Sequence, residues 1–382
     1  MELTGRQLNR TTLRRQLLLQ RQPLDVFDAV RRLVGLQAQQ AASPYLALWN
    51  RVADFDPADL DAAFAEHRIV KASLLRITLH AVAADDRPVW HRAVLGSLRG
   101  SRLYDKRFTS TGLTSADADA SLEELLGFLT VPRTNAEVDA YFAERFPEVA
   151  EQRIWWALRT YAPLIHAPGP HPWTFGPRPS YLAAPIQPLE PLEPVEPVDE
   201  AEAMILLARR YLAAYGPATA ADLASFTTLA RAPATAALTA LGDELVRHTG
   251  PDGKPIFDLA DGELSDEDVP APARLLGMWD NVLLAHIDRS RLIPTDYRST
   301  VIRRNGDVLP TLLVDGQVAG VWRPVETGIE ATAFRRLPST VWEALAAEAA
   351  DLTTMLQPRE PSVFSRYGHW WSSITGDEVK VL

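Results

Sequence analysis

The residues whose spacing could do chemistry are two glutamines separated by one alanine, Gln37-Ala38-Gln39, just after Gly35. In an extended backbone both amides would project to one side while Ala38 faces inward, whereas in a helix they would diverge by about 200°. An amide both donates and accepts hydrogen bonds, so such a pair could position a water molecule. Two glutamines beside a turn can equally be solvated or capping residues. The pair is therefore a candidate site only outside a helix.

Polar and apolar side chains alternate further along the chain, where Arg76, Thr78 and His80 are separated by Ile77 and Leu79. In a strand the three polar side chains would share one face. A polar face in a basic region could grip phosphate. The alternative is a half-exposed strand whose histidine is hydrogen-bonded locally, and the sequence leaves both interpretations open.

Two further candidates lie near the C-terminus. His286 and Asp288 alternate in the same way, an arrangement that is commonly structural. Arg303 and Arg304 precede the turn residues Asn305-Gly306, which predicts a basic hairpin tip. Such a tip could enter a DNA groove, or it could keep a sheet edge soluble.

Composition excludes several kinds of chemistry. Cysteine is absent, which removes disulfides, thiolate metal sites, iron–sulfur clusters and cysteine nucleophiles. The eight histidines form no tight ligand spacing, so we expect no metal. The sequence also has no phosphate-loop, dinucleotide-binding or GxSxG nucleophile motif. We therefore expect no cofactor.

Charge is distributed unevenly along the chain. The net charge is −10, yet residues 1–107 hold 17 basic and 11 acidic residues and the remainder carries −16. A basic N-terminal region on an acidic body is consistent with a confined polyanion-binding face, although solvated surface is an alternative explanation. No apolar stretch approaches the roughly twenty residues that span a bilayer, and the N-terminus lacks an apolar core. We expect a cytoplasmic protein.

The elements that must position these residues follow a repeated order. Helices at 4–19, 26–34, 44–52 and 57–66, then strand-like residues at 68–71 and 75–82, have the order of a winged helix, with Asp25 capping the second helix. Residues 121–184 repeat the pattern, with a helix at 153–159 and strands at 164–166 and 173–175. Residues 199–269 give it a third time, with helices at 201–215 and 232–241 and strands at 244–248 and 256–258.

The remaining segments differ in composition. Proline and glutamate dominate 185–197, which predicts a stiff acidic linker within residues 185–198. After Pro270 the sequence becomes β-rich, with strands expected at 283–287, 299–303, 308–314 and 317–322 and a helix at 338–355. We therefore predict five parts, which are 1–120, 121–184, 185–198, 199–269 and 270–382.

An ordered series of fragments resembles the AlkZ/YcaQ family of winged-helix DNA glycosylases over nearly the whole chain. Each fragment is weak alone, and their order and spacing carry the resemblance. The fragments are Gly35-Leu36-Gln37-Ala38-Gln39, Arg76-x-Thr78-Leu79-His80, Trp155-Trp156-Ala157-Leu158-Arg159, Ala208-Arg209-Arg210-Tyr211-Leu212, Tyr215-Gly216-Pro217-Ala218-Thr219 and Asp280-Asn281-Val282-Leu283-Leu284-Ala285-His286.

The resemblance implies an α+β fold of three tandem winged helices and a small C-terminal β-barrel, C-shaped around a concave, basic DNA-binding face. It also implies a catalytic glutamine-apolar-glutamine motif, here Gln37 and Gln39, which is the form associated with self-resistance to azinomycin-type crosslinkers. The residues expected to bind DNA are Lys71, Arg76, Thr78, His80, His286, Arg303 and Arg304. The expected partner is double-stranded DNA with alkylated or crosslinked guanine, bound by a nucleoid-associated monomer.

The implied chemistry has a physical basis. Alkylation at N7 makes guanine a cationic leaving group, so neutral amides suffice to place water against C1′ and to stabilise oxocarbenium-like charge. We expect a monofunctional hydrolase that leaves an abasic site, because Lys71 is the only candidate Schiff-base lysine near the motif. A crosslinked base cannot rotate freely out of the duplex, so the glutamines should lie at an open cleft and not in a deep base pocket.

Two other function classes fit winged helices. One is a transcriptional regulator without catalysis, although the sequence shows no coiled-coil heptads for dimerisation. The other is a scaffold that binds protein partners through the acidic C-terminal half, whose DNA binding would lack strong salt dependence.

Overall fold

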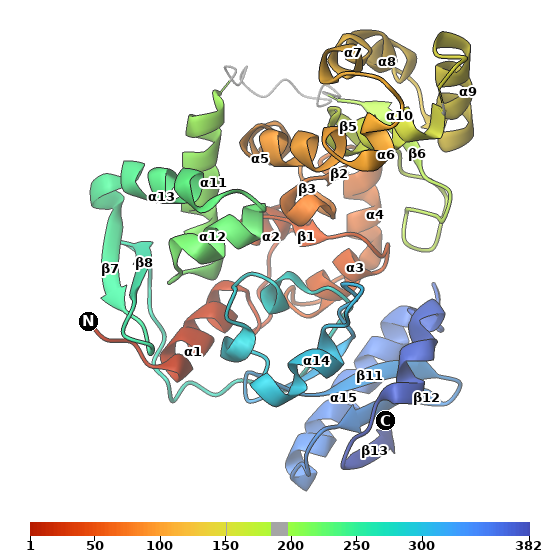
Figure 1. Ribbon diagram of the computed structural model, residues 1–382. Coiled ribbons are helices and arrows are strands. Elements are labelled where there is room, and N and C mark those ends of the chain that lie inside the picture. Colours follow the sequence, from red (N-terminus) through yellow and green to blue (C-terminus); the bar gives the residue numbers. More distant parts are fainter. Residues whose placement is uncertain (150, 185–197) are drawn as a thin grey trace.

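The computed structural model describes residues 1–149, 151–184 and 198–382, and the side chains of residues 151 and 152 are not described. The described chain has the expected α+β composition, with helices packed around three sheets (Figure 1). The predicted linker lies outside the described residues except for Val198. The division of the chain into three winged-helix units stays a prediction.

The N-terminal helices begin within one residue of their predicted starts. They are α1 (Gly5–Arg15), α2 (Val26–Arg32), α3 (Ser43–Trp49) and α4 (Pro57–Ala65). Asp25 caps α2 as expected, because its carboxylate accepts from the backbone N–H groups of Phe27 and Asp28. Helix α1 ends earlier than predicted, because Leu17 adopts a left-handed conformation with φ 58°.

A six-stranded sheet joins the strands of the first two predicted units. Its order is β1 (Leu36–Gln37), β3 (Leu79–Ala83), β2 (Ile69–Ser73), β5 (Leu164–His166), β6 (Ser180–Ala183) and β4 (Arg133–Thr134). In this sheet Gln37 lies opposite His80, and His80 in turn lies opposite Ala72. Lys71, the residue before Ala72, lies opposite His166. Because neighbouring positions point to opposite faces, Gln37 and Lys71 lie on opposite sides of the sheet.

The strand predicted at 173–175 is wrong. Those residues form a turn in which Trp173 packs on Tyr45, with ring centroids 5.0 Å apart, and Thr174 has φ 61°. The hydroxyl of Thr174 also donates to Asp61 at 2.7 Å, so side-chain bonds fix the turn. The strand that pairs with β5 is instead β6, a few residues later.

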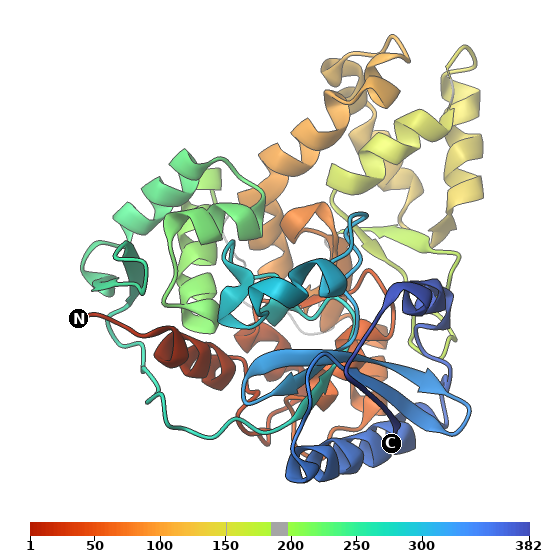
Figure 2. The ribbon, with the colours of Figure 1, turned by 60° about the horizontal axis from the view of Figure 1, so that its bottom comes forward.

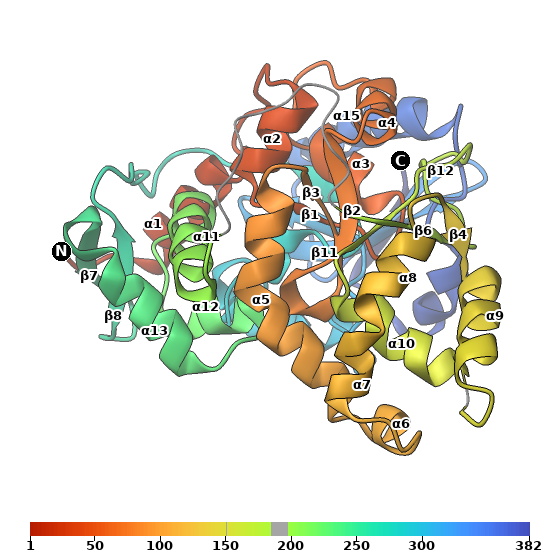
Figure 3. The same ribbon diagram turned by 90° about the horizontal axis from the view of Figure 1, so that it is seen from above.

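Helix α5 (Asp86–Leu103) was not predicted, although Trp90, Val94 and Leu98 recur every four residues and are buried. Figure 3 shows α5 running between α11 (Glu200–Tyr215) and α10 (Glu151–Tyr161), and it contacts both. The other helices of this region are α6 (Lys106–Thr109), α7 (Ser115–Ala120), α8 (Leu122–Phe128) and α9 (Asn135–Arg145).

The third segment forms as expected. Helix α11 is followed by α12 (Ala220–Thr227), α13 (Arg231–Ala240) and the hairpin of β7 (Leu245–Thr249) and β8 (Pro255–Leu259). Thr219 caps α12 with a reciprocal bond to Asp222, the pattern of a capping box.

The C-terminal sheet is open, so the predicted small barrel is wrong. Its order is β13 (Glu378–Val381), β12 (Gly328–Ala333), β11 (Gln317–Val325), β10 (Thr311–Val314) and β9 (Arg274–Leu276). Within the described chain β13 and β9 are its two unjoined edges. Helix α15 (Ser339–Leu356) packs against the sheet, as Figure 2 shows.

Two predicted C-terminal strands are also wrong. Residues 283–287 begin within a short helix at Asn281–Leu283, because the Asp280 carboxylate accepts from the N–H of Val282 and turns the chain. Residues 299–303 overlap α14 (Arg298–Val301), in which only Val301 is buried. One buried position in a turn favours a helix, whereas a strand would bury every second residue.

The N-terminal helices and the C-terminal sheet share one hydrophobic core. Leu46 and Leu48 of α3 are buried in the same cluster as Leu276 and Trp322 of the sheet. At its edge Arg51 and Asp280 form a two-pronged ion pair at 2.7 and 2.8 Å, and both side chains are 1% exposed. This packing brings the segment around residue 281 against the strand that carries Gln37.

Candidate active site around Gln37 and Gln39

Gly35 sets the path of the chain into the candidate motif. Its φ of 105° is left-handed, and a Cβ on it would lie 2.6 Å from Cγ1 of Val82, so only glycine fits. The Gly35 carbonyl accepts from the side-chain amide of Asn281 at 2.9 Å. The turn from α2 into β1 is therefore fixed by the C-terminal part of the chain.

Gln37 is buried and held by Arg76. Nη2 of Arg76 lies 2.8 Å from Oε1 of Gln37, 2.6 Å from Oδ1 of Asn281 and 3.2 Å from Nε2 of His80. All three atoms accept, because arginine carries only donors. The structure thus brings Gln37, Arg76 and His80 together, a contact that the sequence did not predict, and adds Asn281, whose role was not predicted either.

The turn that carries Arg76 has an unusual backbone. Arg76 and Ile77 are both left-handed, with φ of 54° and 57°. Such conformations are costly for residues other than glycine, and most of all for a β-branched residue such as Ile77. The expected continuous strand at 75–82 is therefore interrupted, and the turn aims the Arg76 guanidinium at Gln37 instead of at solvent.

The charge of Arg76 is enclosed without an acidic partner among the described residues. Its contacts are neutral amides, His80 and the ring of Phe226, whose centroid lies 5.2 Å from the guanidinium carbon. Its Nη1 is buried and has no hydrogen-bond partner in the described part of the chain. Burial lowers the pKa of Arg76 to about 10, so the group is charged at neutral pH.

His80 is fully buried beside this charge. Its Nε2 accepts from Arg76, so Nδ1 carries the proton and donates to the carbonyl of Thr78 at 3.1 Å. Burial, reinforced by the charge of Arg76, lowers the pKa of His80 to about 3. His80 is therefore neutral and positions its neighbours.

This low pKa predicts that stability falls in mild acid. An unfolded histidine takes up a proton below about pH 6.5, whereas folded His80 does so only near pH 3. The free energy of unfolding should therefore decrease as pH falls from about 6.5 towards 3, by about 1.4 kcal/mol per pH unit for this group. Urea unfolding at a series of pH values measures the slope.

Two other buried histidines add to the same trend, because burial lowers the pKa of His286 to about 3 and that of His91 to about 4. Replacing His80 with glutamine should reduce the slope of unfolding free energy against pH by the contribution of one proton, about 1.4 kcal/mol per pH unit. Replacing exposed His369 with glutamine is the matched control and should leave the slope unchanged. An unaltered slope in the His80→Gln variant would contradict the assignment.

Gln39 differs from Gln37. It lies in a bend after β1 ends, and its side chain is exposed, whereas Ala38 between them is buried with 1% exposure. Ala38 therefore faces inward as expected, but only one amide is free to meet a ligand. Gln39 and Thr78 line a cavity of about 260 Å³ that is open on one side.

Several cavity residues were missed by the sequence analysis. They come from α5, α10 and the strands β5 and β6, and they include Arg102, Trp156, Arg159, Thr160, His166 and Tyr181. Arg102 lies at the end of the unpredicted α5, so finding that helix from its apolar spacing would have been the first signal. Arg159 belongs to a fragment used for the family resemblance, but nothing in that fragment marks a site.

The other predicted DNA-binding residues are more scattered. Lys71 is 5% exposed on the opposite face of the sheet, with Nζ 4.6 Å from the centroid of Phe175. Burial lowers its pKa to about 8. Arg303 and Arg304 lie at a turn closed by a bridge between Ile302 and Val308, and Arg304 is exposed. The turn is therefore basic, as expected, but far shorter than a regular hairpin.

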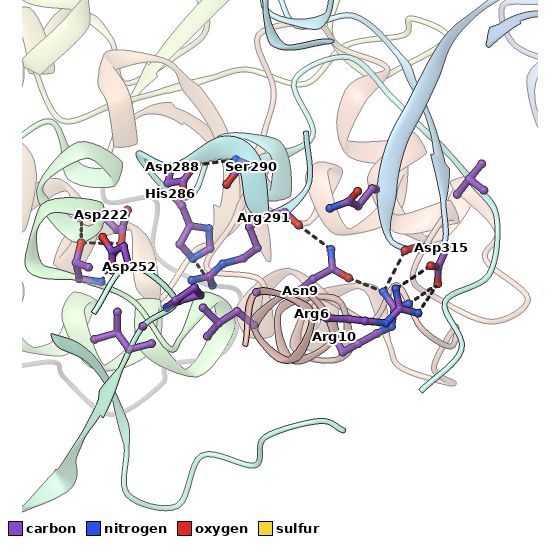
Figure 4. Close-up of a pocket in the computed structure, with 18 of the residues that line it drawn as sticks. Arg6, Asn9, Arg10, Asp222, Asp252, His286, Asp288, Ser290, Arg291 and Asp315 are labelled. Atoms are coloured by element: carbon purple, nitrogen blue, oxygen red, sulfur yellow. Dashed lines mark hydrogen bonds and ion pairs between the residues drawn. The ribbon is translucent and has the colours of Figure 1, made fainter. Parts of the chain in front are cut away.

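His286 is 3% exposed and lines a second cavity of about 490 Å³ (Figure 4). Its Nε2 lies 2.9 Å from Nη1 of Arg291, and across the cavity Arg6 and Arg10 are both paired with Asp315. Arg6 and Arg10 thus share one carboxylate, and the buried imidazole of His286 contacts Arg291. We assign Lys71, His80 and His286 supporting roles, because their burial keeps them from contacting a duplex.

Comparison with known proteins covers most of the chain. A family model described as "DNA glycosylase AlkZ-like" matches residues 30–355, and the chain belongs to this family of DNA glycosylases. A curated relative, the "Interstrand DNA cross-link repair glycosylase" of Streptomyces sahachiroi, is 28% identical over 368 residues, covering 92% of this chain and 96% of the relative.

A solved structure, the Streptomyces sahachiroi DNA glycosylase AlkZ, matches with a TM-score of 0.79 and 26% identity. The match covers 92% of this chain and 96% of that one. The predictions of the family and of an enzyme are confirmed, which sets aside the regulator and scaffold alternatives. In the described ranges no helix is long and apolar enough to cross a membrane, and no group of acidic or histidine side chains could hold a metal ion.

Proposed function

We propose that the chain hydrolyses the N-glycosidic bond of N7-alkylguanine and unhooks interstrand crosslinks made by bis-alkylating agents of the azinomycin type. The observation that carries the proposal is the exposed Gln39 at the wall of an open cavity that none of the described acidic residues lines. Without a carboxylate, the site suits a base that already carries positive charge and needs neither protonation nor a strong base. The open side suits a base tethered to the opposite strand.

The two glutamines have different roles in this proposal. Gln39 is the catalytic residue, because its amide is free to accept from the attacking water and to direct its carbonyl dipole at the developing charge on the sugar. Gln37 is a positioning residue, because Arg76 occupies its Oε1. It fixes the end of β1 and thereby the place from which Gln39 reaches the substrate.

The proposed DNA contacts follow the exposed candidates. Thr78 lines the cavity, and exposed Arg304, with half-buried Arg303, lies at the turn before β10. Arg303 is already anchored, since its guanidinium donates to Ser373 at 2.8 Å and lies 4.5 Å from the ring of Trp370. We infer that Arg304 is the freer phosphate contact of the two, on the concave face of a C-shaped monomer built from three winged helices.

A crosslinked duplex tests the proposal. Incubation with DNA that carries one N7-guanine bis-alkyl crosslink should separate the strands on a denaturing gel and leave alkali-labile abasic sites. Borohydride should trap no covalent complex, because the amine of Lys71 is buried and lies 4.6 Å from the ring centroid of Phe175. If borohydride traps a covalent complex with the wild-type protein but not with a Lys71→Gln variant, the protein is not a monofunctional hydrolase. A crosslink that persists after incubation would contradict the proposed substrate.

A further inference from the structure

The cavity beside Gln39 contains an electrostatic feature that the proposed function does not use. We propose that Arg102 and Arg159 form a binding site for one backbone phosphate of the DNA strand that carries the lesion. This inference rests on the proposed function only in taking DNA as the ligand. A phosphate bound by Arg102 and Arg159 would fix the position of the adjoining sugar relative to Gln39.

The two arginines come from helices that pack side by side. Arg102 lies in the last turn of α5 and Arg159 in the last turn of α10 (Figure 3). Nε of Arg102 donates to the hydroxyl of Thr160 at 2.9 Å, and its guanidinium carbon lies 4.6 Å from the ring centroid of Trp156. The Arg102 side chain is therefore held in place before any ligand arrives, which reduces the entropy lost on binding.

The positive charge at this site is only partly compensated, because Asp105 opposes the lowering of the Arg102 pKa without pairing with it. Neighbouring Arg99 pairs with Asp119, and Arg107 pairs with Asp105 at 2.9 Å. Neither Arg102 nor Arg159 forms an ion pair with any acidic residue that the structure describes, and no aspartate or glutamate lines the cavity. Burial, then repulsion from Arg107 and Arg159, lowers the pKa of Arg102. An anion between the two guanidinium groups would relieve that repulsion.

The chemistry of the wall favours a phosphate over a stacked base. Both Arg102 and Arg107 lie over the ring of Trp156, at 4.6 and 3.9 Å, so this tryptophan is already covered. The remaining polar groups include the hydroxyl of Tyr181, which can donate to a phosphate oxygen, whereas the hydroxyl of Thr78 already donates to the carbonyl of Leu75 at 3.0 Å. Guanidinium groups bind phosphate through paired N–H donors, which makes arginine the residue best suited to this anion.

His166 lines the same cavity as a neutral group. Burial, then the charges of Lys71 and Arg159, lowers its pKa well below the usual value. It therefore adds a hydrogen-bonding group without a further charge. Among the described residues, Arg102 and Arg159 are the two cations that line the cavity, and Lys71 acts on His166 without lining it. Two lining cations suit a single phosphodiester that carries one negative charge.

The salt dependence of binding to an undamaged duplex tests the site. Each phosphate neutralised contributes about 0.9 to the slope of log K against log salt concentration. The Arg102→Gln and Arg159→Gln variants should each reduce the slope by up to about 0.9, and the double variant by no more than that, because one phosphate is shared. Arg159→Lys should retain the slope.

The matched control is Arg99→Gln, whose arginine lies nearby but is already paired. This variant should keep the wild-type slope, and thermal unfolding checks that every variant is folded. Equal loss in the control, or an unchanged slope in both Arg102→Gln and Arg159→Gln, would overturn the proposal.

A second experiment identifies which backbone phosphate of the DNA binds at this site. Neutral methylphosphonates placed one at a time around an N7-methylguanine should weaken wild-type binding at one position near the lesion, and the double variant should be insensitive there. Stabilisation by inorganic phosphate without any methylphosphonate effect would mean a free-anion site and overturn the assignment. Because the salt slope is measured on an undamaged duplex, from which no base is released, a failed glycosylase assay leaves that result intact, and the reverse also holds.

Discussion

Gln39→Ala is expected to lower the single-turnover rate of N7-methylguanine release about 10²–10³-fold, the usual effect of removing one preorganised polar group from an active site. Its side chain is exposed, so the free energy of unfolding should change by no more than about 0.5 kcal/mol. Single-turnover kinetics with excess protein measure the chemical step, and urea unfolding measures stability.

Gln40→Ala is the matched control, because Gln40 is the next amide and its side-chain carbonyl accepts from the backbone N–H of its neighbour Ala41 at 3.0 Å. It should retain nearly the wild-type rate. Gln37→Ala should lower both rate and stability, the latter by about 1–3 kcal/mol, because it removes an acceptor from the enclosed Arg76. A Gln39→Ala variant as active as Gln40→Ala would show that Gln39 does not position the water.

Arg51→Ala is expected to destabilise the protein by about 3–5 kcal/mol, because it leaves the carboxylate of Asp280 buried without its partner. The pair is 1% exposed on both sides, and it fastens α3 to the segment that carries Asn281. Asn281 holds both Gly35 and Arg76, so the loss should reach the active site as well. Urea unfolding and base-release rates measure the two effects.

Arg14→Ala serves as the comparison, since the Arg14 and Glu263 side chains are 50% and 73% exposed. Removing this surface pair should cost no more than about 1 kcal/mol. The Arg51→Ala, Asp280→Ala double variant should lose less stability than the two single variants added together, because neither charge is left alone. Equal losses for Arg51→Ala and Arg14→Ala would show that the buried pair does not join the two parts.

Local signals in the sequence predicted most elements, and long-range packing accounts for most errors. Asp25 and Thr219 act through bonds to residues two or three positions away, so the helix starts they cap could be read directly. By contrast, 283–287 reads as a strand from its apolar residues, yet Ala285 is buried because it packs with α11, whose Tyr211 donates to its carbonyl at 2.8 Å. A short apolar run does not distinguish a strand from an irregular segment that is buried against a distant helix.

The candidate site was predictable only in part for the same reason. Gln37-Ala38-Gln39 could be picked out by its neighbours in sequence, and Gly35 by its turn. The sequence could not predict that Gln37 is buried while Gln39 is exposed. This difference depends on Arg76 and on Asn281, which lies 244 residues after Gln37. The positive φ values of Arg76 and Ile77 have no signal in their residue types, since neither residue favours that conformation.

The central claim is that the motif at Gln37 and Gln39 releases an alkylated base. The most direct test is to incubate duplex DNA carrying a single N7-methylguanine with excess protein and to measure the free base by mass spectrometry. The wild-type protein should release N7-methylguanine and leave an abasic site, and the Gln37→Ala, Gln39→Ala double variant should release it no faster than the uncatalysed background. Absence of free base with folded, DNA-bound wild-type protein, or equal release by the double variant, would contradict the account.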